Sequence, residues 1–325
     1  MKLIYTILGI ALLATACNSQ PKEKKQTDAE ETPKGDTTAV VEVTKGTRRM
    51  ERTVPSIVEI HNLDELNYAI EHYWDGFDFE AGERVAEYDT MDMCQALIDY
   101  AALVIPTRDY TPMRRLIERA EASRPVLEYF MTITEMVFHD PNSPMRNDEL
   151  YIPILERLAE SPLLDEYDRL IPQHDLHIAL QNRIGHTAND FVYTLSDGSK
   201  GDLHDIEADY TLLMFNNPDC PMCRAIMEDI NASPLLNEMQ ELGRLQVITL
   251  YPDEDLAAWR NNLDRMPRRW KVSYDDGGVI TEEKLYDLRA IPALYLLDSQ
   301  KRVLVKDGTN VIQIEEIIAY RETHI

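Results

Sequence analysis

The sequence predicts two folded parts of different class, an all-α part followed by an α/β part in which helices flank a mixed sheet. The chain has 325 residues, more than a single hydrophobic core usually serves. Apolar residues recur at helical spacing from residue 63 to about residue 181, and short apolar runs alternate with helical patterns from residue 185 onward. The expected parts are a leader (1–17), a polar tether (18–54), a helical domain (55–183) and an α/β domain (184–325).

The composition limits the classes of partner. Hydrophobic residues make up 44% of the chain and charged residues 28%, as in ordinary globular proteins. Acidic residues are in excess and give a formal net charge of -25. A field of this sign repels phosphate backbones, so we expect no nucleic-acid partner.

The first residues have the pattern of an export signal. An apolar run from Leu3 to Leu13 is followed by small residues up to Ala16. The run is shorter than the roughly 20 residues that span a bilayer, and small residues suit a signal peptidase. Cys17 then resembles the acylated cysteine of bacterial lipoproteins, which implies a lipid anchor in the membrane and a location in the cell envelope. The alternative is a secretory signal cut near Ala16, which would leave Cys17 as a free thiol.

Residues 18–54 are expected to form a disordered tether. Lys, Glu, Thr, Pro and Gln dominate this segment, and almost no large apolar residue precedes Val40. Such a segment buries too little apolar surface to fold. After a lipidated cysteine it would act as a flexible spacer between the membrane and the folded domains.

The segment after Thr90 illustrates the helical pattern of the first domain. Its apolar residues fall at three- and four-residue steps, which predicts one buried face made of Met91, Cys94, Leu97, Ile98, Ala101 and Ile105. Similar stripes run through 113–120, 126–138 and 150–158, with prolines as starts or breaks. Cys94 is therefore interpreted as a small core residue.

From residue 185 the chain alternates strand and helix patterns. The expected strands are 191–195, 210–215, 245–251, 293–297 and 302–305. The expected helices are one beginning at Pro221 and others at 255–263, 284–288 and 311–320. This alternation implies a mainly parallel sheet that is covered on both faces and completed by an antiparallel pair.

A pair of cysteines stands between one of these strands and its helix. Cys220, Pro221, Met222 and Cys223 follow the buried strand 210–215 and open a helix. With two residues between them, the cysteines can close a disulfide without stretching the backbone. Unpaired N–H groups at a helix N-terminus stabilise a thiolate, the species that attacks disulfides. Cys220 is thus the expected nucleophile and Cys223 the thiol that resolves the mixed disulfide, while Pro221 fits the first helical turn.

Four groups of residues in this half, taken together, match the pattern of one protein family. They are Ala188 to Phe191, Asp197-Gly198, Leu213 to Phe215 with Pro218 to Cys223, and Arg289 to Asp298. This combination resembles the thioredoxin-like domains of envelope thiol-disulfide oxidoreductases. The resemblance implies that Ile291 and Pro292 hold the substrate chain beside the cysteines, with Pro292 in a cis peptide bond. It also implies exported proteins with disulfides as substrates and a separate redox protein as electron donor.

The departures from the family pattern also carry information. Asp219 stands where the family often has Trp, and its negative charge opposes thiolate formation. Met222 stands in the intervening pair, which contains no His, so we expect a dithiol that favours reduction of substrates. Met214 occupies the position of a buried acid found in many thioredoxins, and Asp253 or Glu254, after strand 245–251, are the expected substitutes.

The densest aromatic cluster of the helical part runs from His72 to Phe79. It resembles the start of an uncharacterised helical domain that precedes thioredoxin-like domains in exported bacterial lipoproteins. The favoured interpretation is a helix end that packs its rings into the domain core. The alternative is a groove for a peptide or partner next to the dithiol.

Other roles for the cysteines and histidines remain as alternatives. The rival function is a non-enzymatic binding or structural module in which Cys220 and Cys223 form a static disulfide. Structural zinc needs four ligands, and the chain has no second closely spaced cysteine pair. His174 and His177 lie one helical turn apart, but no third ligand can be named. We therefore expect no metal and no cofactor besides the redox-active disulfide.

Overall fold

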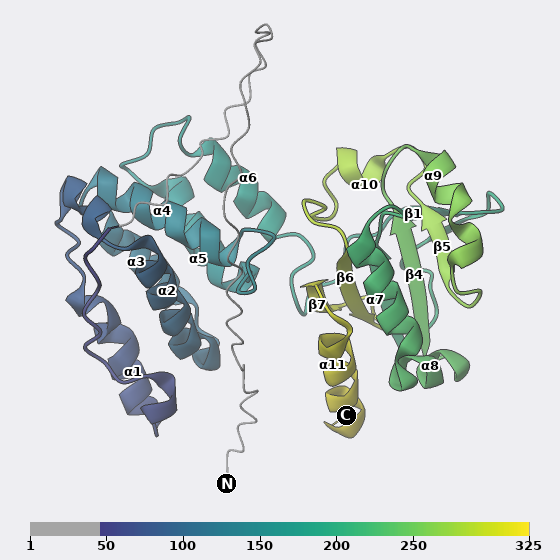
Figure 1. Cartoon of the computed structure of the whole chain (residues 1–325), viewed down its shortest axis with the longest axis horizontal. Helices are drawn as coiled ribbons and strands as arrows, with labels where there is room; N and C mark the ends of the chain where they lie inside the picture. The colour runs from purple at the N-terminus through teal and green to yellow at the C-terminus, as the bar shows by residue number, and fades with distance from the viewer. Residues whose placement is uncertain (1–45, 325) are drawn as a thin grey trace, which may run out of the picture. The chain divides into compact units, whose positions relative to one another are not determined.

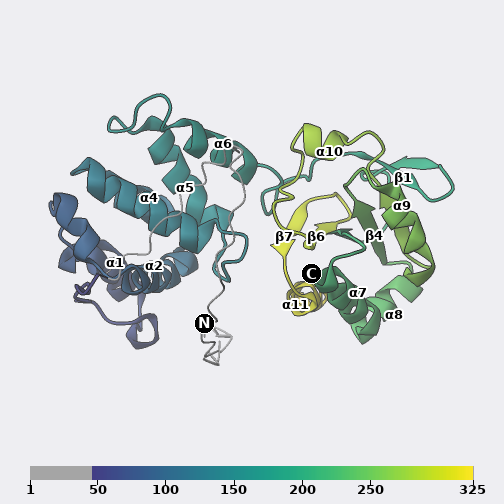
Figure 2. The same ribbon diagram turned by 45° about the horizontal axis from the view of Figure 1, so that its top comes forward.

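The computed structural model describes residues 46–324, so the predicted leader with Cys17 and the tether up to residue 45 lie outside the described residues. The first half consists of helices with short 3-10 turns between them, and the described residues before 192 form no strand. The helices are α1 (Leu63–His72), α2 (Thr90–Val104), α3 (Thr111–Ala120), α4 (Arg124–Phe138), α5 (Asp148–Glu160) and α6 (Leu170–Ala179) (Figures 1 and 2). The prediction of an all-α N-terminal domain is confirmed.

Residues 46–54 belong to this helical fold, although the sequence pattern placed them in the tether. Met50 is buried in the core, with 3% of its surface exposed. The chain also passes very close to a helical turn, because a Cβ at Gly76 would lie 2.0 Å from the carbonyl oxygen of Glu51. Only glycine fits at that position. The contacts join residues far apart in sequence, which the local polarity of the segment does not reveal.

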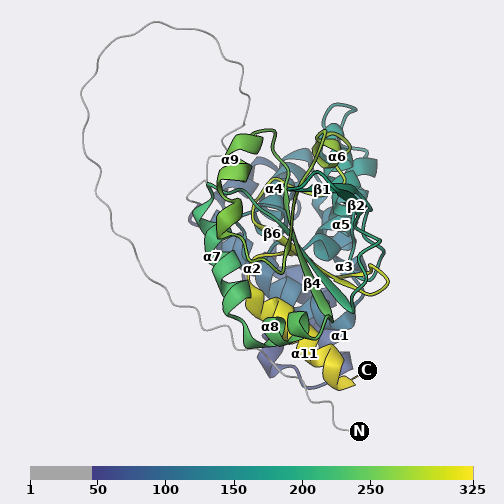
Figure 3. The same cartoon turned by 90° about the vertical axis from the view of Figure 1, so that its right-hand side faces the viewer.

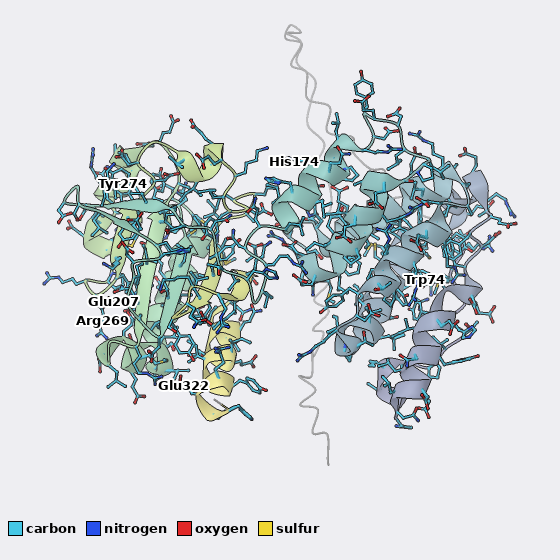
Figure 4. All side chains as sticks on the ribbon, turned by 180° about the vertical axis from the view of Figure 1, so that it is seen from behind. Trp74, His174, Glu207, Arg269, Tyr274 and Glu322 are labelled. Atoms are coloured by element: carbon cyan, nitrogen blue, oxygen red, sulfur yellow. The ribbon has the colours of Figure 1, made fainter. Side chains whose placement is uncertain are left out.

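An aromatic cluster forms the centre of the helical core. Trp74, labelled in Figure 4, is 2% exposed, and its ring lies edge-on to Tyr100 and Phe130 with centroids 5.5 Å apart in both cases. Phe77 makes edge contacts with Trp74 and with Phe130. The interpretation of the 72–79 cluster as core packing is confirmed.

The predicted apolar stripe of α2 is correct in its middle and wrong at its ends. Cys94, Leu97 and Ala101 are buried, whereas Met91 is 64% exposed and Ile105 is 39% exposed. Met91 lies in the first turn of the helix. Ile105 lies in the 3-10 turn that follows α2, where the tighter winding rotates side chains off the helical stripe.

The second half is built on a sheet, which has seven strands within the described residues, in the order β2-β1-β5-β4-β3-β6-β7. The strands are β1 (Val192–Leu195), β2 (Lys200–Asp202), β3 (Tyr210–Phe215), β4 (Leu245–Tyr251), β5 (Lys271–Tyr274), β6 (Ala293–Asp298) and β7 (Val303–Gly308). β3 is parallel to β4 and β4 to β5, whereas the other neighbouring pairs are antiparallel. The sheet is mixed as predicted, but the expectation that it is mainly parallel is wrong.

Helices and loops cover both faces of the sheet. The helices are α7 (Pro221–Ala232), α8 (Pro234–Glu241), α9 (Leu256–Asn261), α10 (Val279–Glu282) and α11 (Val311–His324). Apolar residues of α7, α8 and α11 pack against Leu212 and Met214 of β3. The opposite face, with Leu213 and Phe215, packs against α10 and the chain between residues 188 and 206. Figure 3 shows α7 lying along β4 in this arrangement.

The predicted helix at 284–288 does not form. α10 ends at Glu282, and Lys284 has a left-handed backbone with φ 52°. The following loop buries Tyr286 and Asp287. Residues 284–288 therefore form a loop whose buried side chains make tertiary contacts, and not a helix. β5 and α8 were not predicted, because both are short and their apolar patterns are weak.

Trp74→Ala is expected to lower the free energy of unfolding by about 3–5 kcal/mol, because it removes a buried ring and leaves a cavity. Trp74→Phe retains one ring and should have a smaller effect. The measurement is urea denaturation followed by far-UV circular dichroism. A loss below about 1 kcal/mol for the alanine variant would contradict the central position of this ring in the core.

Candidate dithiol site

The loop between β3 and α7 positions Cys220. β3 ends at Phe215 and α7 begins at Pro221. Asn217 holds the turn, because its backbone carbonyl accepts the N–H of Cys220 at 3.1 Å and its side-chain oxygen accepts the N–H of Asp219 at 2.9 Å. Cys220 is thereby left as the N-cap residue of α7. Asn217 was not singled out from the sequence, although Asn after a strand is a turn signal.

The sulfur of Cys220 lies at the start of α7, as the sequence predicts. Its Sγ accepts the backbone N–H of Cys223 at 3.2 Å, one of the N–H groups that the helix itself leaves unpaired. The thiol also faces the carbonyl oxygen of Ile291 at 3.7 Å and can donate to it. Cys220 is half-buried, and both cysteines of the pair are free thiols. A thiolate at Cys220 would therefore be stabilised by a helix N–H while remaining partly accessible.

Cys223 has a different environment. It is fully buried, with 0% of its surface exposed. Burial raises the pKa of Cys223 to about 12, although the backbone N–H of Asn217, 3.5 Å from its Sγ, acts in the opposite direction. The group is a neutral thiol at physiological pH. The site thus pairs one accessible sulfur with one shielded sulfur, a chemical difference suited to separate attacking and resolving roles.

The proline loop lies beside Cys220. The Ile291–Pro292 peptide bond is cis, as the sequence predicts. The loop leads into β6, which pairs antiparallel with β3 so that Ala293 lies opposite Phe215. This pairing brings the Ile291 carbonyl to the sulfur of Cys220, across 71 residues of sequence.

The two acids predicted to assist the dithiol are placed differently from each other. Asp253 accepts a hydrogen bond from the side-chain amide of Asn217 at 2.8 Å, which connects it to the loop before Cys220. Glu254 forms no hydrogen bond to either sulfur among the described residues, and both acids are exposed. Their part in deprotonating the second thiol stays a prediction. Met214 is a fully buried apolar residue of β3.

The surface around the carboxyl ends of β3 and β4 is acidic. Burial raises the pKa of Tyr251, at the end of β4, and the negative charges of Asp253, Asp255 and Asp219 raise it further. These carboxylates therefore lie close enough to act on a single phenol. Their field opposes negative charge on a sulfur or on a substrate in this region.

The other cysteine and histidine candidates lie outside this site. Cys94 is buried in the helical core, and burial raises its pKa to about 11. His174, labelled in Figure 4, and His177 are exposed on α6. Within residues 46–324, no group of three or more His, Cys, Asp and Glu side chains is arranged to hold a metal ion. In the same part of the chain, no helix combines the length and the apolar character needed to cross a bilayer.

Two comparisons cover large parts of the chain. Residues 16–182 match a family model described as a domain of unknown function (DUF5106). The crystal structure of a thioredoxin-like protein from Bacteroides caccae is 36% identical in sequence, with a TM-score of 0.76. The match covers 82% of this chain and 98% of the Bacteroides caccae chain. Both parts of the architecture therefore have known relatives.

Curated relatives are more distant. The thiol-disulfide oxidoreductase ResA of Bacillus thuringiensis subsp. konkukian is 29% identical over 137 residues, which is 42% of this chain and 76% of that protein. The probable nucleoredoxin 3 of Oryza sativa subsp. japonica is 28% identical over 124 residues. That match spans 37% of this chain and 26% of the rice protein.

Iodoacetamide is expected to modify Cys220 and to leave Cys223 untouched in the folded, reduced protein at about pH 8. Burial disfavours the thiolate of Cys223, so its pKa of about 12 keeps it protonated until the solution becomes strongly alkaline. Peptide mass spectrometry measures the sites of modification, and Cys94→Ser serves as the control for the remaining buried thiol. Equal modification of both cysteines of the pair would contradict the different environments described above.

Proposed function

Because this chain belongs to the family of thioredoxin-like proteins in which a DUF5106 domain precedes a domain with the thiol-disulfide oxidoreductase fold, we propose that it reduces disulfides of exported proteins through Cys220 and Cys223. One observation carries the proposal. The half-buried sulfur of Cys220 caps α7, accepts a helix N–H and faces the carbonyl of Ile291. A loop backbone at Ile291 and Pro292 next to a capped sulfur is suited to hold a disulfide-bearing chain for attack.

The reaction proceeds through a mixed disulfide. The thiolate of Cys220 attacks one sulfur of the substrate, the substrate disulfide breaks, and the second substrate sulfur leaves as a thiolate that takes up a proton. Cys223 then loses its proton and attacks the sulfur of Cys220, which releases the first substrate sulfur. The substrate has gained two electrons, and the protein is left with a Cys220–Cys223 disulfide. A dithiol redox protein must return two electrons before the next cycle.

The direction proposed is reduction. Strong oxidants of this kind hold their reduced form in a stabilised thiolate state. The negative charge of Asp219, next to Cys220, works against such a state, and Met222 supplies no positive charge between the cysteines. The dithiol form is therefore stabilised less than in an oxidase, which favours electron transfer to the substrate.

The proposed location is the cell envelope. Cys17 follows the apolar run and small residues of the leader, and acylation of its thiol would anchor the chain to a membrane. Disulfides persist in exported proteins, because the compartments outside the cytoplasm are oxidising. The substrates proposed for the dithiol are thus exported proteins that carry disulfides.

Cys220→Ser is expected to abolish the reduction of insulin disulfides by the chain from Asn18 onward, because it removes the attacking sulfur. Cys223→Ser should retain attack and accumulate a mixed disulfide with the substrate. Insulin turbidity measures turnover, and non-reducing electrophoresis detects the trapped adduct. Cys94→Ser is the matched control and should keep full turnover. Comparable turnover by the Cys220→Ser protein would overturn the mechanism.

The redox potential separates this proposal from its rival. A catalytic dithiol should equilibrate with glutathione or thioredoxin-like buffers within the range of known oxidoreductases. A Cys220–Cys223 bridge that stays oxidised well below about -300 mV would favour a binding module with a static disulfide.

Cys17→Ser is expected to move the protein from the membrane fraction to the soluble fraction and to abolish labelling by a radioactive fatty acid, because it removes the acylated thiol. Fractionation and autoradiography of cells expressing the full chain give both readouts. Cys94→Ser should leave both unchanged. If the parent chain takes up no fatty acid, the leader is a simple secretory signal.

A further inference from the structure

A group of charged side chains connects the helical half to the loop that carries Ile291 and Pro292. Of these side chains, Asp287 and His139 are buried, whereas Arg289 is 40% exposed. The loop runs from the end of α10 at Glu282 to the start of β6 at Ala293. Its charged residues Asp287 and Arg289 contact Arg146 and His139, which belong to the helical half. The thiol-disulfide mechanism uses none of these four side chains.

Arg146 joins two carboxylates of the second half. One of its terminal nitrogens donates to Asp287 and to Asp307, at 2.8 Å in both cases. The side chains are shielded from water, with 14% of Arg146, 5% of Asp287 and 8% of Asp307 exposed. Asp307 also accepts the hydroxyl of Tyr295, a fully buried residue of β6, at 2.5 Å. Arg146, which precedes α5, is thereby linked through Asp307 to β6, the strand that follows the proline loop.

Arg289 makes the second connection. Its guanidinium donates two hydrogen bonds to the carboxylate of Asp287, from Nε at 2.9 Å and from a terminal nitrogen at 2.6 Å. Its other terminal nitrogen donates to Nε2 of His139 at 2.5 Å. His139 is 4% exposed, and its ring lies 3.5 Å from Asp175 of α6. The helical half thus supplies an acceptor for the arginine of the loop.

The charge state of Asp287 depends on these arginines. Burial would raise the pKa of Asp287, but hydrogen bonds and charge from Arg289, together with the charge of Arg146, lower it to about 2. The carboxylate is therefore ionised at any physiological pH. Removal of Arg146 would leave this buried carboxylate with the contacts from Arg289, and the loss of one cation would favour displacement of the loop toward water.

The loop is directly connected to the reacting sulfur. Arg289 stands two residues before Ile291, and the carbonyl of Ile291 lies 3.7 Å from Sγ of Cys220. We propose that Arg146 and His139 are positioning residues for the proposed disulfide reduction: they fix Asp287 and Arg289, and through them the proposed substrate-binding loop at Ile291 and Pro292. The helical domain then sets how well a protein substrate is held and leaves the chemistry of the sulfurs unchanged.

This inference, which rests on the proposed function, predicts a specific split in kinetics. Arg146→Met removes the cation and keeps an unbranched side chain, so KM for insulin should rise about three- to tenfold. Reduction of the small disulfide DTNB needs little support from the loop and should change by less than about twofold. Arg146→Lys keeps a cation and should recover part of the insulin KM. His139→Leu removes the acceptor of Arg289 and should shift the insulin KM in the same direction.

The matched control is Arg157→Met. Arg157 lies on α5 and forms a partly buried ion pair with Glu121, so its loss should destabilise the helical half without touching the loop. Thermal unfolding of all variants measures stability, and the ratio of insulin to DTNB activity measures positioning. Arg157→Met should lower the melting temperature and leave that ratio unchanged.

The outcomes separate the two proposals. If the parent chain reduces neither insulin nor DTNB, the proposed function fails. If the parent is active and the ratio is the same in the parent, Arg146→Met and His139→Leu proteins, the positioning role fails while the function stands. An equal shift of the insulin-to-DTNB activity ratio in the Arg157→Met protein would also overturn the positioning role, because a general loss of stability would then explain the effect.

Discussion

The position of one sulfur atom, Sγ of Cys220, constrains the rest of the second half. The sulfur caps α7, so the helix must begin within a few residues of the end of β3. β3 must be central, because β6 has to pair with it for Ile291 to reach the sulfur. A central strand must be apolar on both faces, and β3 is buried along its whole length. Apolar residues of α7, α8 and α11 cover one face of that strand, and α10 with residues 188–206 covers the other.

The chemistry depends on a contrast between two neighbouring thiols. One turn of α7 separates Cys220, which is partly accessible, from Cys223, which is fully buried. In the proposed mechanism, burial keeps Cys223 protonated, so a substrate would meet a single nucleophile and the second sulfur would react once the mixed disulfide had formed beside it. The contrast arises from position along the chain: Cys220 is the N-cap at the start of α7, whereas Cys223 lies inside the first turn and packs in the core with Met214.

Much of this arrangement could be predicted from local sequence. The strands β3 and β4 were predicted at their observed bounds, since each is a continuous apolar run, and the cis peptide before Pro292 followed from the family resemblance. What failed depends on contacts between distant residues. Residues 46–54 look like a tether until Met50 is seen in the core, and 284–288 looks helical although its loop buries Tyr286 and Asp287. Arg146 carries no sequence signal of its own, because its partners lie far along the chain. Asn217 differs, because it bonds to residues of its own loop and its position after β3 was a turn signal that was not used.

The charged contact between the helical half and the proline loop has a physical consequence that an apolar contact would lack. Burying charges is costly, and an apolar contact of similar size would often be at least as stable. Apolar contacts, however, permit sliding, whereas a guanidinium fixes a carboxylate in both distance and direction. Asp287 is held in this way by Arg146 and Arg289 together. In the proposed function this loop presents the backbone of Ile291 and Pro292 to a substrate at a set distance from Cys220, and fixed direction then matters more than added stability. Charged contacts between the helical domain and this loop therefore fix the direction of the loop, which apolar contacts would not do.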